Sequence, residues 1–428
     1  MANLVHIPEV KEVARKTPIE VFPDPKVAVV LINQQAGASN QPLVKVGDTV
    51  AIGQKIADAK ERVSAPVHSP ISGKVIKIEN AYNSCFEAPT EAIFIENDGK
   101  KTKDKSITPI KESDLTSAKN EDLLKIIREA GIIGMGGAGF PTSAKLAVPA
   151  DKPIKYLLVN GAEGEPYDTA DERVMVEKTA NLVRGVRIVR KLLGNPKVIV
   201  VTKESKVEAV EKLKDAFANE PETEVRAMHL TYQQGDAGMM QKAVLGYEPP
   251  AGKRSYESGT IVQNVATINA IANAVFEGEP LITRVITING DVATPKNLLV
   301  KIGTPISEIL AANNVTDCGS VVVGGVMMGV AIQSSDAPVT KRTSSIICFT
   351  KAKAKAKKPT ACIHCGRCVD ACPVRLQPVA IYNAVVKGQF DKAAKLWAQD
   401  CIMCGTCSYV CPANLPLAFN VKMARNSQ

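Results

Sequence analysis

The sequence predicts a multidomain chain of mixed α/β and α+β class. Its 428 residues are enough for two to four domains, and 45% hydrophobic content with a mean hydropathy near zero is typical of a globular protein. Short β-branched runs at the start give way to alternating strand and helix patterns in the middle. Eight of the eleven cysteines are confined to residues 359–428. These shifts indicate a β-rich unit, an α/β unit, a second β-rich unit and a cysteine-rich unit.

A small β-sandwich is predicted for residues 1–105. Residues 42–56 and 63–76 each have a strand, turn, strand pattern broken by glycine and proline. The two similar halves resemble the barrel-sandwich hybrid of biotinyl and lipoyl carriers. Lys60 falls near the place of their modified lysine, but its spacing to Gly73 differs. A carrier with a modified Lys60 is therefore kept only as an alternative interpretation.

An α/β layer fold is predicted for residues 115–280. A buried strand at residues 156–159 precedes a helix at 182–193, a strand at 198–202 and a helix at 207–216. Polar residues follow the first of these strands. Open α/β sheets bind ligands at the carboxyl edge of their strands, so we expect a ligand site there.

A glycine-rich loop follows a helical pattern at residues 121–130. Its glycines free the backbone to approach a ligand, and bare amides in such a loop can hold a phosphate. Formally, Gly134, Gly136 and Gly139 match the dinucleotide fingerprint G-x-G-x-x-G. The match is weak because a helix, not a strand, precedes the loop and Pro141 closes it. A plain glycine-rich turn remains the alternative.

A β-rich module is predicted for residues 281–350. Alternation over residues 281–288 followed by Asn289-Gly290 indicates a hairpin with its turn at those two residues. The segment Gly324–Gly329 is interpreted as tight packing between domains, with a second ligand loop as the alternative. The Lys/Ala run at 351–358 is typical of a solvated linker, or else of a patch for an acidic partner or an anionic membrane face.

The cysteine-rich end contains two copies of the run C-x-x-C-x-x-C-x-x-x-C-P, which holds two [4Fe–4S] clusters. Three thiolates of each copy can bind one cube, and the fourth usually binds the other. The first predicted set is Cys362, Cys365, Cys368 and Cys411. The second predicted set is Cys401, Cys404, Cys407 and Cys372. Zinc is the alternative, but the spacing is not that of ribbons or fingers.

The remaining cysteines, Cys85, Cys318 and Cys348, are scattered. Cys318 and Cys348 lie in apolar stretches and are expected to be small buried hydrophobes. Cys85, between two strand-like runs, is expected to be structural, with a reactive thiol as the alternative. Because eight thiols must stay reduced, we predict a cytoplasmic location.

Composition argues against two other classes of protein. Net charge is +9 and aromatics are 4%, with no recognised nucleic-acid motif, so nucleic-acid binding is not predicted. The longest apolar candidate, residues 321–332, is interrupted by glycines and is too short to span a membrane.

Three segments resemble a known family. Residues 134–145, 160–166 and 259–267 resemble the FMN and NADH site of the complex I flavoprotein. With the sandwich in front and two ferredoxin-type motifs behind, the order of domains resembles the RnfC family, the C subunit of the Rnf ferredoxin:NAD oxidoreductase. This resemblance covers nearly the whole chain.

The resemblance implies roles for individual residues and domains. It implies an FMN phosphate and ribityl site at Gly134, Gly136, Gly137, Gly139 and Lys145. It implies flavin-lining residues at Asn160, Glu163 and Glu165, and a phosphate side completed by Gln263 and Asn264. Residues 115–280 would be Rossmann-like, 281–350 a β-grasp (SLBB-type) module, and 359–428 a helical 2×[4Fe–4S] ferredoxin-type domain. Asp236 stands where relatives have an acidic pair, which puts the NAD(H) contact in question.

The implied activity is that of an NADH dehydrogenase-type subunit of a ferredoxin:NAD oxidoreductase. Hydride would pass between NAD(H) and FMN, and single electrons through the two clusters. The implied partners are other electron-transfer subunits or ferredoxin, in a complex peripheral on the cytoplasmic face of the membrane. The start, Val5-His6-Ile7-Pro8, lacks the paired glycines usual in the family. The alternatives are therefore a soluble relative serving a reductase such as proline reductase, or a relay without nucleotide binding.

Overall fold

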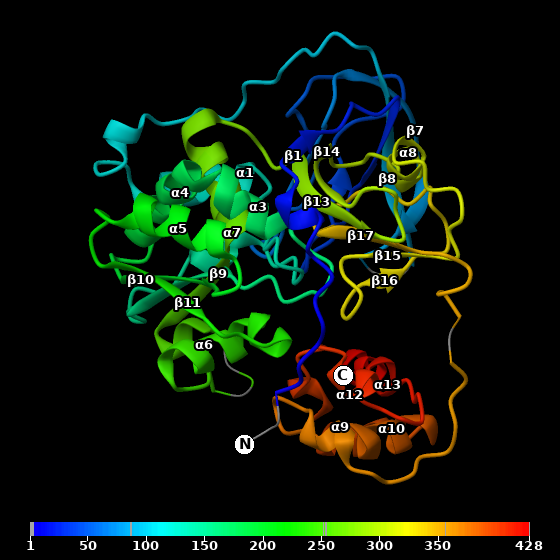
Figure 1. The fold of residues 1–428 in the computed structure, drawn as a ribbon. Coiled ribbons are helices and arrows are strands. Elements are labelled where there is room, and N and C mark those ends of the chain that lie inside the picture. The colour runs from blue at the N-terminus through cyan, green and yellow to red at the C-terminus, as the bar shows by residue number, and fades with distance from the viewer. Residues whose placement is uncertain (1–3, 86–87, 251, 253–254, 356, 428) are drawn as a thin grey trace.

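The computed structural model describes residues 4–85, 88–250, 252, 255–355 and 357–427. Figure 1 shows an α/β body beside two β-rich bodies, with a small helical module below them. The predicted mixed α/β and α+β class is confirmed. In the described residues no helix combines the length and apolarity that a membrane crossing requires.

The N-terminal unit is a sandwich of two antiparallel sheets. One sheet has the order β2-β8-β7-β4, and the other β3-β5-β6. Its strands are β2 (Val27–Leu31), β3 (Gln41–Pro42), β4 (Thr49–Val50), β5 (Lys55–Asp58), β6 (Val67–His68), β7 (Gly73–Asn83) and β8 (Ala88–Asn97). Fully buried β-branched residues from both sheets, Val30, Ile56 and Ile93 among them, form the core. The predicted sandwich is confirmed.

The α/β unit contains a parallel four-stranded sheet of order β11-β10-β9-β12. Its strands are β9 (Tyr156–Gly161), β10 (Lys197–Lys203), β11 (Thr223–Met228) and β12 (Thr260–Asn264). Its helices are α1 (Asn120–Glu129), α2 (Thr142–Leu146), α3 (Ala170–Glu177), α4 (Thr179–Leu192), α5 (Val207–Phe217), α6 (Ala237–Leu245) and α7 (Val265–Ala272). Alternate strand residues pack on opposite faces, so Leu157 joins the main helical core while Leu158 packs with Met240 of α6.

The second β-rich unit is a six-stranded mixed sheet of order β1-β14-β13-β17-β15-β16, accompanied by helix α8 (Ile306–Ala312). Its strands are β1 (Ile19–Val21), β13 (Thr283–Gly290), β14 (Lys296–Lys301), β15 (Ser320–Val323), β16 (Val330–Ala331) and β17 (Ser345–Phe349). The edge strand β1 comes from the N-terminus and pairs with β14. The predicted domain boundary at residue 105 therefore separates β1 from the sheet in which it lies.

The expected hairpin exists between β13 and β14, but its predicted turn is wrong. Asn289 and Gly290 are the last residues of β13, and the chain reverses over residues 291–295. Gly290 is needed for packing: a Cβ there would lie 2.2 Å from the carbonyl oxygen of Cys348 on β17. A glycine demanded by a neighbouring strand cannot be distinguished in sequence from a turn glycine.

The helical module at the C-terminus is built from two similar halves. Its helices are α9 (Arg367–Asp370), α10 (Pro378–Val386), α11 (Phe390–Lys395), α12 (Thr406–Tyr409) and α13 (Leu417–Asn426). Short helical turns elsewhere are η1 (Ala14–Lys16), η2 (Glu112–Asp114), η3 (Tyr232–Gly235), η4 (Ser255–Ser258), η5 (Asn273–Glu277) and η6 (Ala398–Asp400). In Figure 1, α12 and α13 lie on the side of the module toward β16, and α9 and α10 lie on the far side.

Candidate functional site

The glycine loop between α1 and α2 lies against the start of α7. The Met135 amide donates to Thr267 Oγ1 at 2.9 Å, and a Cβ on Gly136 would lie 3.2 Å from Asn264. Gly137 has a φ of 109°, and within the described residues no atom lies within 4 Å of where its Cβ would be. The middle of the loop therefore presents bare, exposed backbone with room for a ligand to approach.

One side chain outside the predicted set holds the loop from its other side. Arg342 Nε donates to the carbonyl of Gly137 at 2.9 Å. Gly139 packs so closely on Arg342 that a Cβ there would lie 2.8 Å from its Cδ. Gly134 closes the turn, since its amide donates to the Phe140 carbonyl at 2.8 Å. Arg342 carries no motif signal, and only the packing of the β-rich module on the α/β unit brings it here.

Lys145 on α2 contributes a positive charge next to β12. Its Nζ contacts the Val262 carbonyl, and burial lowers the pKa of Lys145 to about 8. Among the described residues no carboxylate forms an ion pair with it. A desolvated ammonium without a counter-ion is stabilised by an anionic ligand such as phosphate.

The carboxyl ends of β9 and β12 place Asn160 and Asn264 side by side as register partners. Asn160 Nδ2 donates to the Gly235 carbonyl at 2.9 Å, and Asn264 Oδ1 accepts from Ala266 N at 2.9 Å to cap α7. Gln263 is 2% exposed and its Nε2 has no hydrogen-bond partner. Buried polar atoms normally find partners, so this amide is free to bind a ligand acceptor.

Glu163 is held by the protein itself. Its carboxylate pairs with Lys206 Nζ at 2.8 Å and accepts from the Asp171 amide at 2.6 Å, at the N-terminus of α3. Burial alone would raise the pKa of Glu163, but Lys206 and Lys11 lower it below its usual value. Lys11 Nζ also donates to the Glu163 carbonyl at 2.8 Å. The carboxylate thus fixes the turn after β9, at a residue with an unusual φ of 44°.

Glu165 binds the second β-rich unit. Its two oxygens accept from the amides of Met327 and Met328 at 3.0 and 2.9 Å. A Cβ on Gly325 would lie 2.2 Å from Glu165 Cδ, so the packing interpretation of this glycine segment is confirmed at Gly325. Burial, then the nearby Asp168 carboxylate, raises the pKa of Glu165 to about 8.

Asp236 has a structural role at the position where the family motif is altered. Its carboxylate accepts from the amides of Gly238 and Met239 at 2.9 and 3.1 Å, which caps α6. Lys11 and Lys206 contact Glu163, and the Tyr232 carbonyl packs against Gly164. Sequence reasoning missed these three residues because they belong to no motif. A cavity of about 570 Å³ elsewhere, among β2, β7, β8 and the α8 region, contains none of the predicted site residues.

Six of the eight motif cysteines have neighbours that cross between the two motifs. Burial raises the pKa of Cys407 to about 12, and the nearby thiols of Cys404, Cys401 and Cys372 add to this rise. These four also line one small cavity. Burial raises the pKa of Cys368, whose neighbouring motif thiol is Cys411. Cys372 from the first motif thus lies with the second, and Cys411 with the first, which supports the predicted exchange of fourth ligands.

Backbone amides beside the motif cysteines donate hydrogen bonds to sulfur. The amides of Met403 and Leu376 donate to the sulfurs of Cys401 and Cys372 at 3.3 and 3.2 Å. His364 contributes its own amide, at 3.4 Å from Cys362 Sγ. Such bonds favour thiolates and influence cluster potential. His364 therefore acts through its backbone beside the cluster site.

The described residues contain no group of three His, Cys, Asp or Glu side chains placed to hold a single metal ion. Two runs of four cysteines that each end in Cys-Pro, with backbone N–H donors to sulfur, are the pattern of two [4Fe–4S] clusters and not that of a zinc ribbon or finger. The donor set therefore favours clusters over zinc.

The other cysteines are partly or fully covered. Cys348 is 1% exposed, and burial raises the pKa of its thiol to about 12. Cys318 lies partly buried beside it. Cys85 Sγ lies 3.3 Å from Thr340 Oγ1, and burial raises the pKa of the Cys85 thiol. A raised pKa disfavours the thiolate, so the structural interpretation of Cys85 is supported.

The two sites fit the expected cofactors. Bare loop amides, the Lys145 ammonium and the Gln263 amide suit a phosphate-bearing flavin, and the two cysteine sets suit two [4Fe–4S] clusters. The fold and site thus define an iron–sulfur flavoprotein of the electron-transfer class.

Comparison with known families agrees domain by domain. Residues 127–273 match the Nuo51 FMN-binding domain, residues 2–100 the RnfC barrel-sandwich hybrid domain, and residues 361–415 the 4Fe-4S dicluster domain. The chain belongs to the RnfC family.

Relatives match along nearly the whole chain. The C subunit of the Na⁺-translocating ferredoxin:NAD⁺ oxidoreductase complex of Acetobacterium woodii is 38% identical, over 98% of this chain and 95% of that one. The C subunit of the proton-translocating ferredoxin:NAD⁺ oxidoreductase complex of Clostridium ljungdahlii is 39% identical, over 87% and 82%. The C subunit of the ion-translocating oxidoreductase complex of Rhodobacter capsulatus is 37% identical, over 98% and 82%.

A solved structure shares the fold. A chain of the NAD⁺-reducing [NiFe]-hydrogenase in its H₂-reduced state superposes with a TM-score of 0.51 and 17% identity, over 75% of this chain and 63% of that one. At that identity the likeness concerns the fold alone.

Proposed function

We propose that this chain is the RnfC subunit of an ion-translocating ferredoxin:NAD oxidoreductase complex. In this role it exchanges hydride between NAD(H) and FMN and passes single electrons through two [4Fe–4S] clusters. The observation that carries the proposal is the presence of a phosphate-type loop and two four-cysteine motifs in one chain that a relative matches over 98% of its length.

The protein residues bind and align the cofactors in this proposal. The amides of residues 136–138 and the Lys145 ammonium bind the phosphate end, and Gln263 Nε2 supplies a further donor. Asn160 and Asn264 order the strand ends, while Glu163 and Glu165 fix the turn after β9. A bound flavin takes up two electrons together and releases them singly, which matches a two-electron donor to one-electron clusters.

The location of the complex is also a proposal. Relatives are subunits of ion-translocating complexes, so we infer that this chain docks on the cytoplasmic face of a membrane through partner subunits. The basic run at residues 351–358 supports contact with an acidic partner or an anionic surface. A soluble relative that serves a reductase such as proline reductase is the alternative. Recovery of the chain only in the soluble fraction of gently lysed cells would favour it.

A visible spectrum tests the activity directly. The chain is reconstituted anaerobically with iron, sulfide and FMN, and NADH is then added. Loss of flavin absorbance followed by bleaching of the cluster shoulder is the expected result. If dithionite bleaches both chromophores while NADH and NADPH do nothing, the chain is a relay between proteins, in line with the helix-capping use of Asp236.

A further inference from the structure

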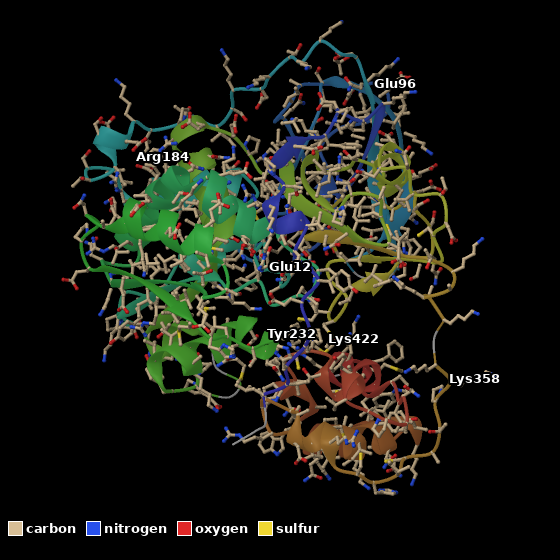
Figure 2. All side chains as sticks on the ribbon, viewed as in Figure 1. Glu12, Glu96, Arg184, Tyr232, Lys358 and Lys422 are labelled. Carbon is tan, nitrogen blue, oxygen red and sulfur yellow. The ribbon has the colours of Figure 1, made fainter. Side chains whose placement is uncertain are left out.

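Residues 9–15, called here the N-terminal strap, run along the seam between the α/β unit and the second β-rich unit before the chain enters β1. Figure 2 places Glu12 at this seam. Chain ends are usually poorly ordered unless specific contacts hold them. Lys11 and Ala14 are fully buried, so one side of the strap is packed into the molecule.

Backbone hydrogen bonds fix the strap to the turn that follows β9. The Val10 amide donates to the Pro166 carbonyl at 2.8 Å. Asn289, near the end of β13, donates through Nδ2 to the carbonyls of Val10 and Tyr167 at 2.8 and 2.9 Å. The strap, the turn and the second β-rich unit are therefore held together at one point.

Further contacts anchor the other end of the strap. The Asn297 side chain of β14 donates to the Ala14 carbonyl at 2.7 Å, and Arg173 of α3 donates to the Arg15 carbonyl at 3.1 Å. The Arg15 guanidinium also lies 3.5 Å from the Glu172 carboxylate. Because the donors come from two different domains, the strap is anchored on both sides of the seam.

Lys11 is the charged side chain that the strap brings to the turn. It is 0% exposed, and its Nζ donates to the Glu163 carbonyl at 2.8 Å and lies 3.8 Å from the Glu9 carboxylate. Burial lowers the pKa of Lys11 to about 8, and the charge of Glu163 acts against this fall. The ammonium form is therefore retained near neutral pH, directly against the turn that is expected to line the flavin.

The charge of Lys11 acts on more of the turn than Glu163. Burial raises the pKa of Glu165 to about 8 and also raises the pKa of Asp168, and in both cases the Lys11 charge acts against the rise. Charges interact more strongly in such a buried site than in water. A flavin bound against the same turn would therefore experience this charge as well.

We propose that the N-terminal strap is part of the flavin site and that Lys11 is its positioning residue. Lys11 holds the turn of residues 163–166 in place and adds a positive charge there. A flavin that has taken up two electrons carries negative charge on its ring, so this ammonium favours the reduced cofactor. The inference rests on the proposed function for the presence of FMN.

Removing the lysine charge tests the proposal. Lys11→Met keeps a long unbranched side chain without the charge, and Lys16→Met removes an exposed lysine at the end of η1. The chain is reconstituted with iron, sulfide and FMN and is titrated with reductant while flavin absorbance is followed. We expect Lys11→Met to weaken binding of reduced FMN relative to oxidised FMN about tenfold, which lowers the flavin potential by about 30 mV for two electrons. Lys16→Met should leave the potential unchanged.

The neighbouring carboxylate gives a test of opposite sign. Glu9 pairs with Lys11 and also contacts Lys203 Nζ, so Glu9→Gln leaves these ammonium groups less neutralised. We expect Glu9→Gln to favour reduced FMN about threefold, which raises the potential by about 15 mV. The matched control is Glu12→Gln, which removes an exposed carboxylate 3.7 Å from Arg15 and should have no effect. Loss of packing alone would not move the potential in opposite directions in the two strap variants.

Amide hydrogen exchange covers a Lys11→Met chain that binds FMN poorly. In the chain without FMN, the Val10 amide reports whether the strap is docked, and the Asp171 amide, which donates to Glu163, reports whether the turn is fixed. We expect Lys11→Met to speed exchange at both amides about tenfold and Lys16→Met at neither. Unchanged exchange at both amides in Lys11→Met would overturn the positioning role.

The outcomes separate this inference from the proposed function. A wild-type chain that binds no FMN would remove both. If the wild type binds FMN and is reduced by NADH, three results would overturn the inference alone. These are an unchanged potential in Lys11→Met, equal shifts in Lys11→Met and Lys16→Met, and shifts of the same sign in Lys11→Met and Glu9→Gln.

Discussion

The cluster module and the flavin domain position their functional residues in different ways. In the module, all eight cysteines lie within residues 362–411, and each motif repeats the same backbone, with positive φ at His364 and Met403 and again at Gly366 and Gly405. In the flavin domain, the residues around the loop come from positions as far apart as 134 and 342.

The difference extends to what stabilises each region. The α/β unit has a large apolar core behind its sheet, whereas the described residues of the module form two small apolar clusters, in which cysteines themselves take part. Burial also raises the pKa of several module thiols, which opposes the thiolate form that iron requires. We therefore expect the module to depend on its metal for folding and the flavin domain to depend on its packing.

Removing iron should change the folded structure more than any of the substitutions described below. We expect anaerobic chelation to unfold residues 359–428 while residues 4–350 stay folded, because metal binding supplies folding energy to a region with so small a core. Hydrogen exchange measured segment by segment gives the answer. A module that keeps its protection without iron would remove the distinction between the two regions.

Substituting the fourth ligands, Cys372 and Cys411, should have the next largest effect. Cys372→Ala should remove one cluster and leave Cys401, Cys404 and Cys407 open to anaerobic alkylation, as identified by peptide mass spectrometry. Cys411→Ala is the reciprocal variant and should expose Cys362, Cys365 and Cys368 instead. The opposite pattern in both would show that each motif binds its own cluster.

Lys206→Met should destabilise the flavin domain by about 3–5 kcal/mol, because it leaves the Glu163 carboxylate buried without its principal partner. The matched control is Lys212→Met on α5, which breaks only an exposed pair with Glu208 and should cost about 0.5 kcal/mol or less. Urea unfolding followed by tyrosine fluorescence measures both. Equal losses of unfolding free energy would show that the buried Lys206–Glu163 pair adds no more stability than the exposed Lys212–Glu208 pair.

Lys145→Met should weaken FMN binding about 10- to 100-fold, because it removes the charge expected to bind phosphate. Lys152→Met removes an exposed lysine from the segment after α2 and should leave affinity unchanged. Equilibrium titration of apoprotein with FMN measures the dissociation constant. Unchanged affinity in Lys145→Met would exclude this lysine from the phosphate site.

The pH dependence of FMN binding should be the smallest effect. Burial lowers the pKa of Lys145 to about 8, and a bound phosphate would raise it again. The protonated lysine binds, so affinity should be steady near pH 7 and fall as pH rises above 8, by at most about tenfold per unit. Lys145→Met should abolish this fall, and a persistent fall in the variant would assign it to another group.

Sequence patterns located several helices and strands, including α1, α4, α5, β9 and β10, because each has a clear apolar period and recognisable ends. They failed at Gly290, because a glycine is required there by close packing on the Cys348 carbonyl of a neighbouring strand. They also could not show that Glu163 and Glu165 bind Lys206 and the Met327 loop, since these partners lie far away in the chain.

The sequence by itself determined the cysteine sets, the glycine loop and the order of domains, because each depends on residues that are neighbours in the chain. Only the tertiary structure decided that Arg342 holds the loop, that Lys206 neutralises Glu163, and that Cys404 faces the flavin domain while Cys365 faces solvent. The two cysteine motifs are nearly identical locally, so only contacts between domains give them different surroundings.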